Sequence, residues 1–421
     1  MGYRLVSEAA FGSRPGVSVH GDGRTDPAVR WTAAVALGGQ GRFAAAAALL
    51  EGLLRDPRTP PEIRAHAFVA RASHLRQRGG HAAAERLDGA AAALATAVLR
   101  GRDRPGGPAG ETVAATPALL PPTGPDGTPR GLSGVAEADA LSALADALVG
   151  LAADALGQGS FPRATALLAR AEALAITGAR RPLTSDDEVI RRPLSGSDGR
   201  AGAVPGCRRS LVRLGWVRAE LALAQGDLRA ARRAAAQALV GADALGSLRH
   251  RIKSALLVGV VDAVAAAQAS AAGAPATGAG ARRDPGDQDV AAEAPHPTLA
   301  AALGTLDAVA RDAVAAGLLP LAWAALKAAA DLTPVTPASP LEVIDTAGVG
   351  RPPSGGSGRP SDRPNGSVHP HDRRPEWLLR STNGAPNDAA RRRHAADVTL
   401  SVIRARSEGV GRRLMGGVVH G

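Results

Sequence analysis

Five short segments of this chain share one pattern: a glycine, any residue, an apolar residue or histidine, two further residues, and an alanine. The glycines are Gly41, Gly79, Gly159, Gly226 and Gly317, and the closing alanines are Ala46, Ala84, Ala164, Ala231 and Ala322. Glycine permits the left-handed backbone that ends a helix, and alanine lets two helices approach closely. The pattern therefore predicts helical hairpins that pack through small side chains.

Four stretches rich in glycine and proline divide the chain, which holds 51 Gly and 31 Pro in 421 residues. Such composition cannot bury enough apolar surface to offset chain entropy, so we expect long disordered linkers at 101–134, 179–206, 271–296 and 333–386. Residues 1–25 are expected to be a flexible N-terminus. The remaining ranges are predicted to be helical: 26–100 (repeats 1 and 2), 135–178 (repeat 3), 207–270 (repeat 4 and the first helix of repeat 5), 297–332 (the remaining repeat helices) and 387–415 (a C-terminal capping helix).

The spacing of the five glycines also indicates a repeat. They lie 38, 80, 67 and 91 residues apart, and without the predicted linkers these intervals become 38, 46, 39 and 65. The first three intervals are close to the length of one helical hairpin, and the last is close to the length of two. Periods of this size are typical of solenoids built from paired helices.

The copies resemble tetratricopeptide repeats, in which a glycine ends the first helix, an aromatic residue opens the second, and small residues occupy the helix crossing. The first copy matches at Gly41, Phe43, Ala46, Leu50, Leu53 and Pro57, and the fourth matches at Gly226, Leu228, Ala231, Ala235 and Ala238. His81 and Leu228 replace the usual aromatic residue. The resemblance implies a right-handed α-solenoid of about six antiparallel helix pairs, whose concave groove holds a peptide or protein partner.

The composition favours the same all-α class. Aromatic residues make up only 2% of the chain, and much of the 45% hydrophobic content is alanine. Because alanine buries little area, the core must come from many close helix contacts. Met1 to Ala10 lacks the apolar run of a secretory signal, and the apolar stretch at 254–274 is interrupted by Asp262 and Gln268. We therefore expect a cytoplasmic protein without a membrane span.

No motif for catalysis, a cofactor or a metal is found in the sequence. Lys253 and Lys327 do not follow the glycine-spaced turn of a phosphate-binding loop. His369 and His371 fall in a predicted linker, where no helix would hold them in ligand geometry. Cys207 has no evident base nearby, and a lone cysteine beside a linker is usually incidental. The sequence thus predicts a protein that is not an enzyme and that needs no cofactor.

Four residues are candidates for partner binding: Arg213, Trp216, Arg249 and Lys253. Arg213 and Trp216 belong to an amphipathic helix, and Arg249 and Lys253 share one helix face because they are four residues apart. One interpretation is a contact with an anion or an acidic peptide in the groove. The alternative is a solvated helix face on which the arginine stems cover alanines. Trp31 and Trp323 are expected in the core.

The C-terminal helix suggests a different partner. Arg391–Arg393 and Arg412–Arg413 bracket the apolar residues Val398, Val402 and Ile403, and the whole chain has a net charge of +11. The apolar stripe is expected to dock on the preceding helix as a cap. The arginines leave open a nucleic-acid-associated regulator, similar to the repeat-bearing part of large bacterial transcription activators. Arginine-rich composition is also typical of GC-rich genomes, and an enzyme without a recognisable motif is the second alternative.

Overall fold

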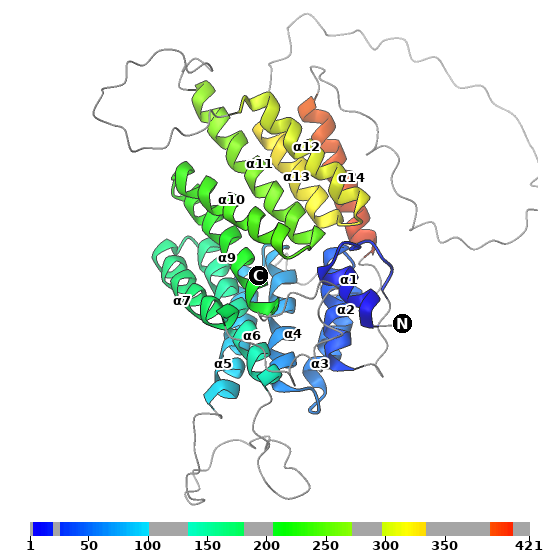
Figure 1. Cartoon of the computed structure of the whole chain (residues 1–421). Coiled ribbons are helices and arrows are strands. Elements are labelled where there is room, and N and C mark those ends of the chain that lie inside the picture. Colours follow the sequence, from blue (N-terminus) through cyan, green and yellow to red (C-terminus); the bar gives the residue numbers. More distant parts are fainter. Residues whose placement is uncertain are drawn as a thin grey trace, which may run out of the picture.

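The computed structural model describes residues 3–19, 26–100, 134–180, 205–271, 297–333 and 388–406. These residues form thirteen α-helices and no strand, which confirms the all-α class for the described part (Figure 1). The predicted linkers fall almost entirely outside the described residues. The helices are α1 (Tyr3–Phe11), α2 (Pro27–Gly39), α3 (Phe43–Arg55), α4 (Pro61–Arg76), α5 (His81–Arg100), α6 (Gly134–Gly157), α7 (Phe161–Arg180), α9 (Pro205–Ala224), α10 (Leu228–Ala244), α11 (Leu248–Ala271), α12 (Leu299–Ala315), α13 (Leu319–Leu332) and α14 (Asp388–Arg406).

The helices pack as sequential pairs. After α1, the pairs are α2 with α3, α4 with α5, α6 with α7, α9 with α10, α11 with α12, and α13 with α14. The first helix of each pair also contacts the first helix of the next pair, and each second helix contacts the first helix that follows it. Neighbouring pairs are therefore joined through the same kind of contact along the whole series.

The glycine pattern marks real turns. All five predicted glycines have positive φ angles, between +72° and +80°. In each turn the N–H of the following residue donates to a carbonyl five residues earlier, at 2.7 to 3.0 Å, as in Arg42 to Leu37 and Leu318 to Ala313. The predicted role of the alanines is confirmed as well, since each is fully buried: Ala46, Ala84, Ala164, Ala231 and Ala322.

Two local predictions need correction. A sixth turn, at Gly246, joins α10 to α11 with φ +64°, and the pattern missed it because the exposed Arg251 stands where the alanine would be. Thr59 and Glu62 have the spacing of a capping box, which predicts that the Thr59 side chain caps the helix that follows, and this is also wrong. Helix α4 begins at Pro61, and the buried Thr59 hydroxyl has no hydrogen-bond partner among the described residues. Asp26, which precedes Pro27 as a cap residue often does, does cap α2 by accepting from the Ala28 N–H at 2.8 Å.

The N-terminus is not a flexible tail as predicted, because residues 3–19 are packed. Val6, Ala9 and Ala10 of α1 are buried against α2. The side chain of Gln40 donates to the carbonyls of Pro15 and Val17, both at 2.8 Å, and so fixes the N-terminal strap, which we define as residues 12–17. This arrangement was not predicted, because a helix as short as α1 leaves only a weak periodic pattern.

The strap brings the two ends of the helix series together. The Leu248 N–H at the start of α11 donates to the Gly12 carbonyl at 3.2 Å, and the Arg249 guanidinium donates to the Val35 carbonyl of α2 at 3.0 Å. Gly16 lies against the backbone of Ala316, at the turn between α12 and α13. The first pair is therefore anchored on α11 and on the turn that precedes α13.

Two helices are long and apolar enough to span a membrane by length and composition alone. They are the Asp139–Gly157 part of α6 and the whole of α11, and 72% and 44% of their most apolar windows are buried within the structure. Core helices of globular proteins meet the same criterion.

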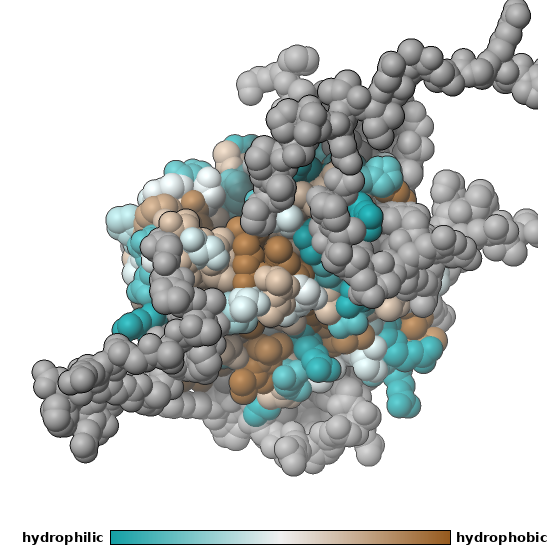
Figure 2. Space-filling model, turned by 90° about the horizontal axis from the view of Figure 1, so that it is seen from above, coloured by the Kyte–Doolittle hydropathy of each residue, from teal (hydrophilic) through white to brown (hydrophobic). Residues whose placement is uncertain are grey.

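Figure 2 shows apolar residues in a band across the middle of one face, bordered by hydrophilic residues.

Candidate binding sites

Two arginines of α9 pair with one buried carboxylate of α6, and a third arginine at the start of α11 lies within electrostatic range of both. Arg209 and Arg213 of α9 both form ion pairs with Asp146 of α6, and the Arg213 pair measures 2.6 Å. The Ser210 hydroxyl donates to the same carboxylate at 2.8 Å. Burial by itself raises the pKa of Asp146, but the two guanidinium groups outweigh it and lower the pKa well below its usual range. We call Arg209, Arg213, Arg249 and Asp146 the basic cluster.

Arg249 is the third cation of the basic cluster. It forms no ion pair with any described residue, and its only described hydrogen bond goes to the Val35 carbonyl. Burial, together with the positive charges of Arg213 and Arg209, lowers the pKa of Arg249 to about 10. The guanidinium is thus charged at neutral pH, in surroundings that disfavour the charge.

Aromatic rings pack beside this cluster. The Arg209 guanidinium lies 5.1 Å from the ring centre of Phe11 and 5.6 Å from that of Trp31. Two buried donors have no hydrogen-bond partner among the described residues: Arg209 Nε and Trp31 Nε1. Unpaired buried donors are uncommon in folded proteins, so these two N–H groups mark a place where a hydrogen-bond acceptor is missing.

Three histidines are buried and neutral in this interior. The His66 ring is tilted against the Trp31 ring with their centres 4.7 Å apart, and the His250 ring is stacked on that of Trp216 at 5.4 Å. The His74 ring packs edge-on against the ring of Phe43 on α3. Burial, followed by nearby arginines, lowers the pKa of His66 and His74 to about 3 and that of His250 well below 6.5.

The structure brings the four predicted partner-binding residues together on α9 and α11. Lys253 lies 6.0 Å from the Trp216 ring centre and forms an ion pair with Glu220 at 3.0 Å. The Trp216 indole donates to the Ser254 hydroxyl at 2.8 Å. Arg213 and Arg249 belong to the basic cluster. All four are partly exposed and have partners within the chain, and their role in partner binding stays a prediction.

A second buried cluster, which the sequence did not reveal, lies between α4, α5 and α6. Arg76 forms ion pairs with both Asp88 and Asp154, and His81 approaches Asp154 at 3.4 Å. Burial raises the pKa of Asp88 to about 7, and Arg76 offsets the effect only in part. The pKa of Asp154 is also raised by burial. We call Arg76, His81, Asp88 and Asp154 the acidic cluster.

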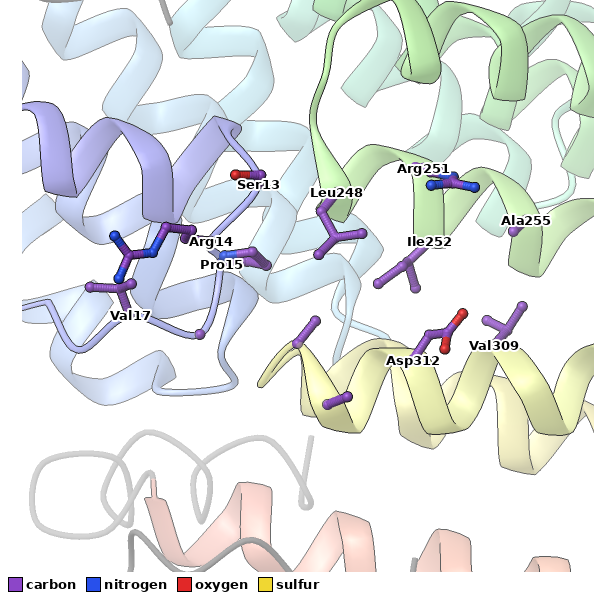
Figure 3. A pocket seen from close by; sticks show the side chains of 13 residues that line it. Ser13, Arg14, Pro15, Val17, Leu248, Arg251, Ile252, Ala255, Val309 and Asp312 are labelled. Atoms are coloured by element: carbon purple, nitrogen blue, oxygen red, sulfur yellow. The ribbon is translucent and has the colours of Figure 1, made fainter. Parts of the chain in front are cut away.

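A groove lies between the N-terminal strap, α11 and α12, with a volume of about 720 Å³ (Figure 3). Leu248 and Ile252 of α11 point toward α12, and Asp312 points back from α12. Ala255 and Val309 complete an apolar floor. Arg14, Arg251 and Ser13 supply polar groups around it.

Helix α14 docks on α13, in agreement with the expected cap. Its apolar stripe is buried at Ile403 and half-buried at Val402. Of the predicted arginine run, Arg392 is buried and pairs with Asp307 through two hydrogen bonds of 3.1 and 2.7 Å. Only Arg391 and Arg393 face solvent.

No group of three or more metal-ligating side chains occurs among the described residues, and Cys207 is fully buried against Gly178. His369 and His371 lie outside the described part of the chain. Comparisons of the chain with models of protein families, with curated proteins and with solved structures give no match. The structure thus establishes an all-helical protein of sequentially paired helices, and its assignment to a family is not supported by any relative.

Proposed function

We propose that this chain is a non-catalytic binding scaffold of the tetratricopeptide type, in which six helix pairs stack as a right-handed solenoid and hold a peptide or protein partner. The repeated contact between the first helices of successive pairs supports this stacking. The five glycine turns and their buried alanines support the repeat.

The groove along α11 carries the proposal. An apolar floor with a few polar groups at its margin is the usual chemistry of a site that anchors an apolar side chain and orients the chain around it. Arg14 of the strap, Arg251 of α11 and Asp312 of α12 all line the groove, so a partner would meet both signs of charge. We therefore propose a partner segment with one or two apolar anchors rather than a strongly charged one.

The proposed groove and the predicted partner residues are on different faces of α11. Residues 248, 251, 252 and 255 line the groove, whereas Arg249 and Lys253 project more than one quarter of a turn away. Contact with Arg213, Trp216, Arg249 or Lys253 is therefore proposed as a second, inner surface. The two surfaces are separable by mutation.

A substitution that fills the groove tests the proposal. Random peptides displayed on phage are selected on the full chain, and enriched peptides are then measured against Ala255→Arg, which places a long side chain over the groove floor. The control is Ala269→Arg, at an exposed position of the same helix outside the groove. We expect binding to be lost in the first variant and kept in the second. Peptides that bind both variants equally, or no enrichment at all, would contradict the groove as the site.

A nucleic-acid partner is the second candidate, because Arg391 and Arg393 are exposed near the start of α14. A charge-driven interaction predicts an affinity that falls steeply with salt. The double variant Arg391→Ala, Arg393→Ala tests whether these arginines bind nucleic acid. Arg392 is left unchanged in this variant because its pair with Asp307 holds α14 in place. Unchanged binding of DNA and RNA by this double variant would remove the candidate.

A further inference from the structure

The charges of the basic cluster do not balance. Asp146 is the only carboxylate that pairs with Arg209, Arg213 or Arg249 among the described residues. The nearby Lys253 is already neutralised by Glu220, and the two closest histidines are uncharged. Only one carboxylate is thus paired directly with this group of three guanidinium groups. Asp88 also acts on Arg213, but only beyond ion-pair distance, and it is itself paired with Arg76. The basic cluster therefore carries an excess of positive charge.

An arginine cannot remove this excess by losing its proton, since a guanidinium stays charged at any ordinary pH. Buried charges in folded proteins are paired or bind ions, because an isolated charge is costly away from water. The mutual repulsion of Arg209, Arg213 and Arg249 adds to that cost. A counter-anion bound beside these guanidinium groups would offset the repulsion.

The cluster also has hydrogen-bond donors to spare and access to solvent. Arg209 Nε and Trp31 Nε1 are buried and have no acceptor within the described part of the chain. The side chains of Arg209 and Arg213 are 13% and 17% exposed, so an ion from solution can reach them. Planar guanidinium groups bind tetrahedral oxyanions through paired N–H donors, which suits phosphate.

We propose that the basic cluster is a binding site for a phosphate-type oxyanion, as the free ion or as a phosphate monoester, held by Arg209, Arg213 and Arg249 at the junction of α6, α9 and α11. The site lies apart from the groove, so it goes beyond the proposed peptide-binding function. Because the anion would link α9 and α11, its binding would stabilise the contact between these two pairs of helices.

Isothermal titration of the full chain with inorganic phosphate and with pyrophosphate, at constant ionic strength in potassium chloride, tests the site. We expect saturable binding, with pyrophosphate tighter than phosphate, and at least about a tenfold loss of affinity in Arg213→Gln and in Arg249→Gln. Arg218→Gln is the matched control, because Arg218 lies on the same helix and pairs with Glu172 at the surface. The control is expected to keep the affinity within about twofold.

A variant that is expected to bind phosphate more tightly distinguishes a loss of binding from misfolding. Asp146→Asn removes the one carboxylate that competes for the arginines, so we expect it to bind phosphate more tightly than the wild-type chain. A folding defect would weaken binding instead. The proposal is overturned if phosphate and pyrophosphate show no saturable binding, if Arg218→Gln loses as much affinity as Arg213→Gln and Arg249→Gln, or if an Asp146→Asn protein with the helix content of the wild-type chain by circular dichroism binds more weakly. Peptide binding in the groove is measured separately and can succeed or fail independently.

Discussion

The acidic and basic clusters use the same chemistry in opposite proportions. In the acidic cluster two buried carboxylates, Asp88 and Asp154, share the single guanidinium of Arg76. In the basic cluster Arg209 and Arg213 pair with the single carboxylate of Asp146, and Arg249 adds a third positive charge nearby. Each cluster thus buries an uncompensated charge between helices that are packed through alanine.

The two clusters can relieve that charge in different ways. A carboxyl group takes up a proton, and the pKa of Asp88 near 7 is the consequence. Arginines keep their protons at neutral pH, so the basic cluster depends on an anion from outside the chain. The comparison predicts that the acidic cluster responds to pH and the basic cluster to phosphate.

The largest effect is expected for Arg76→Ala. Removing the shared guanidinium leaves two carboxylates buried against each other, and we expect the free energy of unfolding at pH 8 to fall by about 3–5 kcal/mol. Urea unfolding measures it. Arg163→Ala, which breaks the exposed pair with Glu85, is the control and should cost about 0–1 kcal/mol. Equal losses in the two variants would mean that the acidic cluster is not held by Arg76.

Gly150→Ala is expected to have the next largest effect. A Cβ at this position of α6 would overlap the carboxylate of Asp88, and overpacking of this kind costs about 1–3 kcal/mol. Gly89→Ala on α5 is the matched control, since its Cβ would meet no atom within 4 Å. Alanine is the better helix former, so this control should be neutral or stabilising by up to about 1 kcal/mol. Thermal unfolding compares the two, and a Gly150→Ala protein as stable as Gly89→Ala would contradict the close approach of α5 and α6.

The pH dependence of stability has two opposing parts. The pKa of Asp88 is raised from 3.8 to about 7, so its contribution is present at low pH and is lost as pH rises from about 4 to 7. The pKa values of His66, His74 and His250 are lowered from 6.5, so their contribution is lost as pH falls below 6.5.

We therefore expect Asp88→Asn to lose stability more steeply on acidification than the wild-type chain, by up to about 1.4 kcal/mol per pH unit between about pH 4 and 6.5. Urea unfolding at a series of pH values measures the slope. Parallel profiles for Asp88→Asn and the wild-type chain would show that Asp88 does not hold the extra proton.

The smallest effect is expected for Lys253→Gln, a substitution at the edge of the basic cluster. Lys253 is partly exposed and balanced by Glu220, so Lys253→Gln should reduce the free energy of unfolding by only about 0–1 kcal/mol. Phosphate affinity should stay within about twofold. A loss of phosphate binding comparable to that of Arg249→Gln would extend the oxyanion site to Lys253.

The turns of this molecule could be predicted from its sequence because each is a local event. A glycine with positive φ and an alanine at the crossing depend on residues a few positions apart, and Gly41 with Ala46 shows the rule. The turn at Gly246 was not predicted because the exposed Arg251 occupies the position of the buried alanine. Helix α11 therefore starts without the close helix contact that the alanine makes in the other turns.

The clusters could not be predicted because their members meet only through tertiary packing. Asp88 and Asp154 lie on alanine-rich helices on either side of a predicted linker, and nothing local distinguishes them from surface carboxylates. Arg213 and Arg249 were predicted as partner residues from their helix faces, but the carboxylate of Asp146 on a third helix was not foreseen. A periodic pattern shows which face of a helix is buried, but it does not show which residues of other helices that face contacts.

The most direct test is a crystal of the full chain soaked with tungstate, a heavy analogue of phosphate, and examined for its anomalous scattering. The account predicts a tungsten peak within hydrogen-bonding reach of Arg209, Arg213 and Arg249, which disappears in Arg249→Gln crystals. Well-ordered arginines with no tungsten peak between them would contradict the view that an oxyanion balances this cluster.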